Sequence, residues 1–282
     1  MILLHLEDRP VNIYFDQGYE RSFGTFPLKG EQLAAALNIA IEVGYRSIDT
    51  AQMYGNERDI GQSLSSLDVP RNKLCITTKV HPDNYSEKLF IPSIEKSLTD
   101  LRVDYVDVLL LHWPPVGEQI ETSLKLLEQA YEKKLALNIG VSNYTAKMMI
   151  FATQLLDAPL STNQVEFHPL LNQDTLLATS KKLEVPLSSY CSVARGEITK
   201  YPLFDKIGKR YGKSASQVGL RWSLQKGVSI NTMSTKMENI KSNFDVIDFT
   251  LSSNDMERVG SLTTINRRLV NKDLVPWAPK WD

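Results

Sequence analysis

The segment 45-YRSIDTAQMYGNE-57 places an acid, Asp49, at the end of an apolar run and a phenol, Tyr54, five residues later. Two other apolar, β-branched runs carry groups that can hold charge or a proton. LCITTKV contains Lys79 near its end, and VDVLLLHWP contains His112. A lysine cation beside a phenol favours the phenolate, so we expect Lys79 to lower the pKa of Tyr54 from its ordinary value of about 10.

These four groups suit one kind of chemistry. A tuned tyrosine can protonate an oxygen as a general acid, and His112 can orient that oxygen through a hydrogen bond. Asp49 is a suitable partner for Lys79, because a buried lysine without a partner is costly. The set fits the oxyanion that forms when hydride adds to a carbonyl. It offers neither the ligand cluster of a metal site nor the Ser–His–Asp order of an esterase.

The elements that must position these groups alternate along the chain. Apolar runs of strand character alternate with stretches of helical periodicity. We expect strands at 22–26, 45–51, 74–80, 106–113, 135–142, 162–168, 187–193 and 228–234. We expect helices at 31–43, 86–101, 120–134, 146–156, 175–183, 202–211, 214–225 and 253–262.

Eight strands alternating with helices require parallel pairing, and eight is the number that closes a (β/α) barrel. A doubly wound open sheet would need a glycine-rich first turn, and no G-x-G-x-x-G follows a strand-like run. We therefore predict an α/β protein with a (β/α)8 TIM barrel, a single domain over residues 1–282. Residues 1–21 are expected to plug the N-terminal end of the barrel.

Taken singly, each candidate residue has an ordinary interpretation. Tyr54 could be a surface tyrosine, Lys79 a solvated lysine at a strand end, and His112 a hydrogen-bonded core histidine. Asp49 could cap the next helix, although it lies too far upstream to do so well. In a barrel, however, all four would lie at the C-terminal ends of strands, which is the face where barrel active sites form. Their shared location favours the functional interpretation.

Composition limits the partners. The chain has 282 residues, of which 23% are charged, and a formal net charge of −1. That balance gives no reason to expect nucleic acid or a membrane surface as partner. Cys75 and Cys191 have neither metal-site nor disulfide spacing, which suits a reducing cytosol. The start MILLHLEDRP does not read as a signal peptide, and no transmembrane run follows. We expect a cytoplasmic monomer.

The chain resembles the aldo-keto reductases in segments spread over nearly its whole length. They are 24-GTF-26, 44-GYRSIDTAQMYGNE-57, 76-ITTKV-80, 103-VDYVDVLLLHWP-114, 139-IGVSN-143, 163-NQVEFHP-169 and 221-RWSLQKGV-228. The resemblance implies that Tyr54 donates the proton, that Lys79 and Asp49 tune it, and that His112 orients the carbonyl. Within the family, 49-DTAQMYGNE-57, 232-TMSTKMENIKSN-243 and 266-NRRLV-270 resemble the bacterial 2,5-diketo-gluconate reductases of the B type. That subgroup implies reduction of small dicarbonyls and of keto acids or esters. We therefore expect small ketones, aldehydes and dicarbonyls, including 2,5-diketo-gluconate, as substrates.

The resemblance also implies NADPH, or less often NADH, bound in an extended form without a Rossmann fold. Ser142, Asn143 and Gln164 would hold the carboxamide, and Tyr190 would stack on the nicotinamide ring. The expected cofactor-binding residues are Gly24, Thr25, Asp49, Ser142, Asn143, Gln164, Tyr190, Cys191, Val193, Arg195, Ser234, Thr235, Lys236, Asn239 and Asn243. Phe26, Tyr54, His112 and Trp113 are the expected substrate contacts.

The sequence departs from the family pattern in two of the loops expected to bind the cofactor, and at Ser22, where a glycine is usual and for which we have no physical account. Met233 and Asn239 stand where many members have the lysine and arginine that grip the 2′-phosphate of NADPH, so we expect a weakened NADPH preference. The usual Ser-Pro-Leu-Gly after the stacking tyrosine is replaced by 191-CSVARGE-197, in which Arg195 adds a positive charge. The short segment after the last helix predicts a more open pocket than in aldose reductases.

Two other classes remain as alternatives. A binding or sensor protein could keep the fold and the cofactor with little turnover, because function lies in the site and not in the fold. A metal-dependent barrel hydrolase would need a cluster of His and Asp ligands at the strand ends, which the sequence does not offer.

Overall fold

The eight predicted strands form a closed parallel barrel. The computed structural model describes residues 12–115 and 119–282, with the strands in the order β1-β2-β3-β4-β5-β6-β7-β8. Their bounds are β1 Arg21–Gly24, β2 Ser47–Asp49, β3 Cys75–Val80, β4 Val106–Leu111, β5 Ala136–Ser142, β6 Leu160–Glu166, β7 Leu187–Tyr190 and β8 Val228–Thr232. Strand β1 pairs with both β2 and β8, which closes the barrel. The predicted (β/α)8 fold is confirmed.

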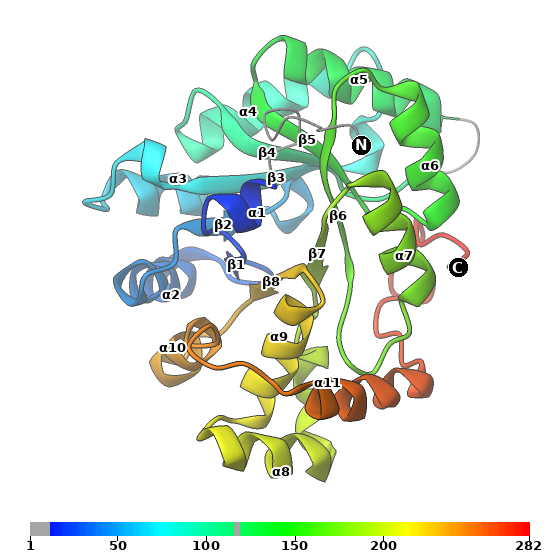
Figure 1. Ribbon diagram of the computed structural model, residues 1–282. Coiled ribbons are helices and arrows are strands. Elements are labelled where there is room, and N and C mark those ends of the chain that lie inside the picture. The colour runs from blue at the N-terminus through cyan, green and yellow to red at the C-terminus, as the bar shows by residue number, and fades with distance from the viewer. Residues whose placement is uncertain (1–11, 116–118) are drawn as a thin grey trace, which may run out of the picture.

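Helices surround the barrel and cover the outer face of its strands (Figure 1). The helices that follow the strands are α2 Gly30–Val43, α3 Glu57–Ser65, α4 Phe90–Leu101, α5 Ile120–Glu132, α6 Ala146–Leu155, α7 Asp174–Leu183, α8 Pro202–Tyr211, α9 Ala215–Gln225, α10 Met237–Phe244 and α11 Ser253–Gly260. The helix ranges given above omit α3 and α10, although a helix was expected to begin after Gly55 and another at Lys236. Helix α3 has charged residues in its first turn, and α10 begins within the loop after β8.

Strand β4 illustrates how side chains alternate between the two sides of the barrel wall. Leu109 and Leu111 belong to the large core between strands and helices. Val108 and Leu110 point to the other side, as the two-residue period of a strand requires, and pack in a separate cluster with Cys75 of β3. Both faces are apolar because both are covered, which explains the continuous run VDVLLL.

The cluster inside the barrel is completed by the N-terminal helix α1, Ile13–Asp16. Ile13 and Tyr14 are buried there with Val108 and Leu110. This packing supports the proposal that the N-terminal segment closes one end of the barrel. Residues 1–11, which belong to the same prediction, lie outside the described residues.

A C-terminal tail, residues 266–282, follows α11 and the short helix η5, Ser261–Ile265. It runs past α7 to α6 (red in Figure 1). Its start is fixed where Arg267 N donates to Leu170 O at 2.7 Å. At its end, Asp282 Oδ2 accepts a 2.8 Å hydrogen bond from Ala146 N, the first residue of α6. The tail therefore lies against the loops that follow β5 and β6.

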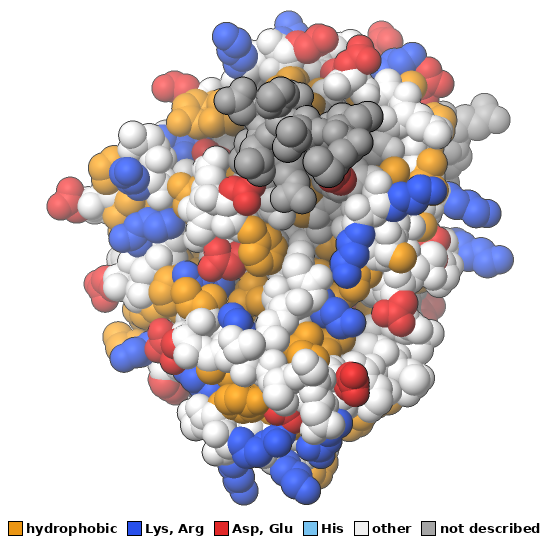
Figure 2. All heavy atoms as spheres, viewed as in Figure 1, with side chains coloured by type: hydrophobic (Ala, Val, Ile, Leu, Met, Phe, Trp, Pro, Cys, Tyr) orange, Lys and Arg blue, Asp and Glu red, His pale blue; other side chains and the backbone are white. Residues whose placement is uncertain are grey.

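The surface carries charges of both signs. On the face seen in Figure 2, acidic and basic side chains are interspersed among apolar and neutral polar ones. Within the described part of the chain, no helix is both long and apolar enough to cross a membrane.

Candidate active site

Lys79 is the centre of the site. Its side chain is fully buried on β3, where strand burial is continuous from Cys75 to Val80. The ammonium group donates to Asp49 Oδ1 at 2.6 Å, to Thr50 O at 2.8 Å and to Tyr54 Oη at 3.4 Å. Three acceptors satisfy its three protons, which is what a lysine needs in a site without water. The structure thus brings Asp49, Tyr54 and Lys79 into direct contact.

Tyr54 ends the short helix η1, Gln52–Tyr54. Its side chain is partly exposed at the mouth of the barrel, the end at which the C-terminal ends of the strands lie. Burial of its hydroxyl raises the pKa of Tyr54, Lys79 lowers it, and Asp49 raises it again, so that the net pKa lies above the ordinary value. The prediction of a net lowered pKa was therefore wrong. The lysine acts in the expected direction, but desolvation of the phenolate is the larger effect.

Lys79 stays protonated for the opposite reason. Burial alone lowers the pKa of Lys79, but the coulombic attraction of Asp49 and Tyr54 and their hydrogen bonds outweigh it and raise that pKa above its usual range. The site therefore holds a cation in contact with a neutral phenol.

His112 lies directly after β4, and its ring meets the ring of Tyr54 edge-on, with centroids 5.5 Å apart. Burial, followed by the charges of Lys79 and His81, holds the pKa of His112 well below its usual range. The imidazole is thus neutral at neutral pH. Its Nδ1 is buried and has no hydrogen-bond partner among the described residues.

The residues predicted to hold the cofactor carboxamide lie together beside Asp49 and His112. Ser142 ends β5, Asn143 follows it in a left-handed conformation (φ 64°), and Gln164 lies opposite Ser142 on β6. Gln164 Nε2 donates to Asp49 Oδ2 at 2.7 Å, and Asn143 Nδ2 donates to His112 O and to Ser142 Oγ, both at 3.1 Å. Tyr190, the last residue of β7, donates its hydroxyl to Asn143 Oδ1 at 2.7 Å. The amides are therefore linked to both Asp49 and His112.

The remaining predicted cofactor residues follow β1, β7 and β8, and so lie at the same end of the barrel. Gly24 ends β1, and Thr25 Oγ1 donates to Asp49 O at 3.0 Å. Cys191, Val193 and Arg195 follow β7, and Cys191 and Arg195 have positive φ values of 52° and 50°. After β8 come Ser234, Thr235 and Lys236, then Asn239 and Asn243 on α10. Of these five, Asn243 is buried, whereas Thr235, Lys236 and Asn239 are exposed.

Apolar residues surround the mouth. Phe26 is 54% exposed, and its ring lies 5.1 Å from that of Tyr54. Trp113 is buried in a cluster to which the tail contributes Val270 and Ala278. All four predicted substrate contacts, Phe26, Tyr54, His112 and Trp113, therefore lie together.

Sequence reasoning missed the contribution of the tail. Trp281 meets Trp113 with ring centroids 6.4 Å apart, and Trp277 meets His81 at 5.2 Å. The expectation of an open rim thus overlooked two tryptophans that pack at the mouth. Their only signal in the sequence is the presence of two large aromatics in a segment whose prolines, Pro276 and Pro279, disfavour a helix.

Glu166 was also missed as a positioning group. It is fully buried at the end of β6, and its two oxygens accept hydrogen bonds from Leu269 N at 2.7 Å and Val270 N at 2.9 Å. His168 Nε2 lies 2.9 Å from the same carboxylate. Glu166 therefore fastens the tail to the barrel.

Comparison with known proteins identifies the class. The model of the Aldo/keto reductase family matches residues 21–264, and the chain belongs to this family of oxidoreductases. It is 36% identical to methylglyoxal reductase DkgB of Escherichia coli O157:H7 over 262 residues, which cover 92% of this chain and 97% of that protein. An aldo-keto reductase of Mycobacterium avium is 37% identical over 240 residues, which cover 85% and 84% of the two chains.

Solved structures agree with this placement. A crystal structure assigned as a 2,5-diketo-D-gluconic acid reductase B superposes with a TM-score of 0.90 at 39% identity, covering 93% of each chain. The aldose reductase of Schistosoma japonicum superposes with a TM-score of 0.83 at 26% identity, covering 89% of this chain and 90% of that one. Across the described residues, no group of three or more His, Cys, Asp or Glu side chains is arranged to hold a metal ion.

Proposed function

We propose that the protein reduces small aldehydes, ketones and dicarbonyls with hydride from NADPH, and that Tyr54 donates the proton. The observation that carries the proposal is the buried contact of Lys79 with both Asp49 and Tyr54. No simple structural need explains a buried lysine whose third proton points to a phenol at the mouth. NADH is a possible second cofactor, because Met233 and Asn239 replace the expected phosphate ligands.

The proton transfer follows from the charges. A carbonyl that receives hydride becomes an alkoxide, which is far more basic than a phenolate, so the proton passes from Tyr54 Oη to that oxygen. The raised pKa of Tyr54 keeps the donor protonated at neutral pH. Lys79, 3.4 Å from the phenol oxygen, stabilises the phenolate left behind, and Asp49 holds the ammonium in place. Lys79 and Asp49 are already charged and in place, so neither group has to move before the proton is transferred.

His112 has a separate part in the proposal. Because its pKa is held well below the usual range, it enters the reaction neutral and does not compete with Tyr54 as proton donor. A neutral imidazole beside the phenol can hydrogen-bond the carbonyl oxygen and hold it near Tyr54 Oη. His112 thereby fixes the position of the carbonyl oxygen relative to Tyr54 Oη for proton transfer.

The residues present fit a nicotinamide cofactor. Tyr190 offers a partly exposed aromatic face, and Ser142, Asn143 and Gln164 gather amide and hydroxyl groups beside it. Such a cofactor would supply the hydride. In this proposal Tyr190 supports the ring, and the three polar residues hold its carboxamide. Ten further predicted residues, which lie at or after the ends of β1, β7 and β8, bind the remainder of the cofactor.

The substrate class is supported by the relatives. Among the similar proteins are methylglyoxal reductases and a 2,5-diketo-D-gluconic acid reductase B, which are named for small dicarbonyl compounds. Phe26 and Trp113 form apolar walls beside Tyr54 that suit small carbonyls. We further propose that the enzyme is a cytoplasmic monomer. Its two free cysteines suit a reducing compartment, and light scattering tests the monomer.

The test combines binding and turnover. NADPH and NADH are titrated against the tryptophan fluorescence of the protein, and methylglyoxal reduction is followed in wild type, Tyr54→Phe and Tyr131→Phe. We expect Tyr54→Phe to bind cofactor and to lose about 100- to 10,000-fold in kcat. Tyr131, a partly exposed tyrosine of α5, is the matched control and should keep wild-type turnover. Failure of the wild type to bind either cofactor would refute the proposal.

A further inference from the structure

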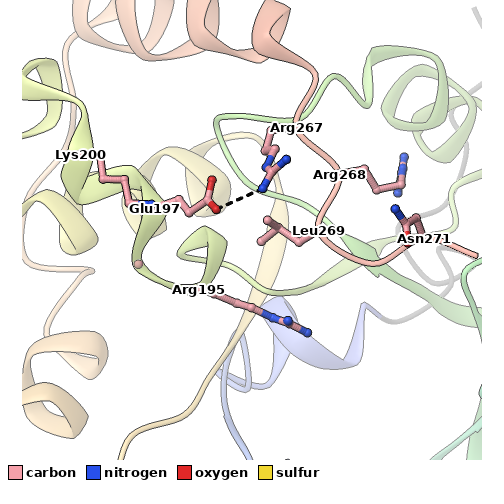
Figure 3. A pocket seen from close by; sticks show the side chains of 8 residues that line it. Arg195, Glu197, Lys200, Arg267, Arg268, Leu269 and Asn271 are labelled. Atoms are coloured by element: carbon pink, nitrogen blue, oxygen red, sulfur yellow. Dashed lines mark hydrogen bonds and ion pairs between the residues drawn. The ribbon is translucent and has the colours of Figure 1, made fainter. Parts of the chain in front are cut away.

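The two sides of the mouth are held together differently. Beside β7, a cavity of about 480 Å³ lies between the loop and the tail, and in its wall Arg267 extends toward Glu197 at 3.5 Å (dashed line in Figure 3). Beside β2, the loop 50–56 carries Tyr54 to the mouth and is tied to its neighbours by side-chain amides. These ties decide where the proposed proton donor lies.

The loop 50–56 has little to hold it from within. Its one turn of helix, η1, has no buried residue and no side-chain cap, and the turn ends at Gly55 in a left-handed conformation (φ 62°). So short a helix is not stable by itself. The contact between Tyr54 Oη and Lys79 Nζ is already 3.4 Å long, so a small shift of the turn would break it. Contacts with neighbouring segments must therefore hold the phenol in place.

Gln52 ties the turn to the loop after β3 and to α4. Its Oε1 accepts from His81 N at 2.8 Å and from Asn84 Nδ2 at 2.9 Å. Its Nε2 donates to Ser93 O at 3.1 Å, and the hydroxyls of Ser93 and Ser97 lie 3.2 and 3.1 Å from the same nitrogen. A backbone N–H on one side and a backbone carbonyl on the other fix the orientation of the amide. The start of η1 is thereby anchored to two other elements.

Asn56 ties the other end of the loop to the segment after β1. It is buried, and its Nδ2 donates to Leu28 O at 2.9 Å and to Thr25 O at 3.2 Å. Its Oδ1 accepts from Thr50 Oγ1 at 2.8 Å, so both donors and the acceptor of the amide are engaged. The segment that Asn56 holds includes Phe26, whose ring packs 5.1 Å from the phenol.

The two amides flank Tyr54, one two residues before it and the other two residues after it. Thr50 extends their network to the cation, because its hydroxyl donates to Asn56 while its carbonyl accepts from Lys79 at 2.8 Å. The phenol and the ammonium group are thus held by one set of hydrogen bonds, which also includes the loops on either side of β2.

We propose that Gln52 and Asn56 are positioning residues for the reaction, which together hold Tyr54 Oη at the distance from Lys79 and from the carbonyl oxygen that proton transfer requires. The inference rests on the proposed reductase function and adds two residues that act through Tyr54. A donor misplaced by about 1 Å can cost on the order of 100-fold in rate. The loss would fall on proton transfer, because Lys79 and Asp49 remain in contact when the turn shifts.

Gln52→Met tests the tie to β3 and α4. The change keeps the length of the side chain and removes its hydrogen bonds, at a partly exposed position. We expect kcat for methylglyoxal to fall about 10- to 100-fold, with NADPH affinity unchanged. Gln217→Met is the matched control, since Gln217 accepts from Ser214 N at 3.0 Å and donates to Asp245 O at 2.8 Å, away from the loop 50–56. The control should keep wild-type kcat.

A series of para-substituted benzaldehydes distinguishes positioning from a loss of folded protein. Electron-withdrawing substituents make the developing alkoxide less basic, so that the reaction depends less on its proton donor. We expect Gln52→Met to slow the single-turnover reduction of 4-methoxybenzaldehyde at least about tenfold more than that of 4-nitrobenzaldehyde. A smaller folded fraction would slow every aldehyde by one common factor. The same substituent dependence in wild type and Gln52→Met would overturn the proposal.

Thr50→Val tests the tie through Asn56. The change keeps the shape of the side chain and removes the hydroxyl that holds the amide, while the Thr50 carbonyl stays available to Lys79. We expect a steeper substituent dependence than in wild type, as for Gln52→Met. A dependence equal to that of wild type would remove Asn56 from the proposal.

The two levels of the proposal fail differently. If wild type reduces the aldehydes and Gln52→Met slows none of them, the positioning role is wrong and the reductase function stands. If neither methylglyoxal nor any benzaldehyde is reduced with either cofactor, the reductase function is wrong, and the positioning role falls with it.

Discussion

Gln164 Nε2 donates a 2.7 Å hydrogen bond to Asp49 Oδ2, while the other oxygen of the same carboxylate holds Lys79 at 2.6 Å. One buried carboxylate thus joins the amide group beside Tyr190 to the cation beside Tyr54. Any change at Gln164 reaches Tyr54, the proposed proton donor, through three hydrogen bonds, which join Gln164 to Asp49, Asp49 to Lys79 and Lys79 to Tyr54.

Replacing Gln164 by Met removes the donor to Asp49 with little change in volume. We expect the free energy of unfolding to fall by about 1–3 kcal/mol, because a buried acceptor is left unsatisfied. We also expect kcat at saturating cofactor to fall, because Asp49 holds Lys79 less firmly. Gln173→Met is the matched control, since Gln173 donates to Glu166 O and does not touch Lys79. Urea unfolding and steady-state kinetics separate the two effects, and an equal kcat in both variants would argue against the coupling.

The pH dependence of reduction should reflect the raised pKa of Tyr54. Burial of the phenol is the main cause of the shift, so the proton is present at and below neutral pH and is lost only above the ordinary tyrosine value of about 10. We expect kcat for carbonyl reduction to stay flat from about pH 6 to 9 and to decline only at higher pH. The measurement is a pH–rate profile at saturating cofactor. A decline centred below pH 9 would contradict the raised pKa.

His112 should make the protein less stable in acid. Its pKa is lowered in the folded state, mainly by burial, so the unfolded chain binds its proton first as the pH falls. The stability that comes from a neutral His112 is present above the unfolded-state pKa of about 6.5 and is lost as the pH falls toward the folded-state pKa. Between pH 7 and 5, wild type should lose roughly 2 kcal/mol more than His112→Gln.

Urea unfolding at both pH values measures this difference. His81→Gln, which leaves the buried imidazole in place, is the control and should lose as much stability as wild type. Equal losses in wild type and His112→Gln would show that His112 is not the titrating group.

Glu166→Gln should loosen the tail without unfolding the barrel. The carboxylate accepts from Leu269 N and Val270 N, and an amide can accept from only one of them while its own N–H₂ opposes the other. We expect tryptic cleavage at Arg267 and Arg268 to become at least about tenfold faster, as a loss of about 1.4 kcal/mol predicts. Mass spectrometry of the released fragment measures the rate.

Glu128→Gln is a control for the change from carboxylate to amide elsewhere in the chain. Oε1 of Glu128 accepts from two backbone N–H groups, of Asp157 and Ala158, in the loop between α6 and β6, so an amide oxygen can keep both bonds. Cleavage in the tail that is equally fast in both variants would mean that Glu166 does not hold the tail specifically.

Met233→Lys should restore a stronger preference for NADPH. Met233 is 40% exposed in the loop after β8, where the family resemblance expects a lysine. A cation there should raise NADPH affinity by about tenfold relative to NADH, because only NADPH carries the additional phosphate. Ile247→Lys, at an exposed position beyond the end of α10, controls for added charge alone. Fluorescence titration with both cofactors gives the ratio, and an unchanged ratio would place the phosphate elsewhere.

The barrel and the meeting of Asp49, Tyr54, Lys79 and His112 were predictable because strand ends share one face in this fold. The direction of the Tyr54 pKa shift was not. The direction depends on how far the surrounding loops exclude solvent from the phenol. The sequence predicts the neighbouring charge of Lys79, but it does not predict how much solvent is excluded. The contacts of Glu166 with Leu269 and Val270 join residues more than 100 positions apart through backbone N–H groups, which leave no mark in residue type. The catalytic and cofactor roles stay predictions.

The start of the tail is fastened by its backbone. Leu269 and Val270 reach Glu166 through main-chain N–H groups, which every residue except proline provides. Mutation could therefore replace Arg268, Trp277 or Trp281 while the fastening persists. The tail side chains that pack at the mouth can therefore vary at little risk to the barrel, and a library randomised at Arg268, Trp277 and Trp281 would test whether they set the specificity of the reductase.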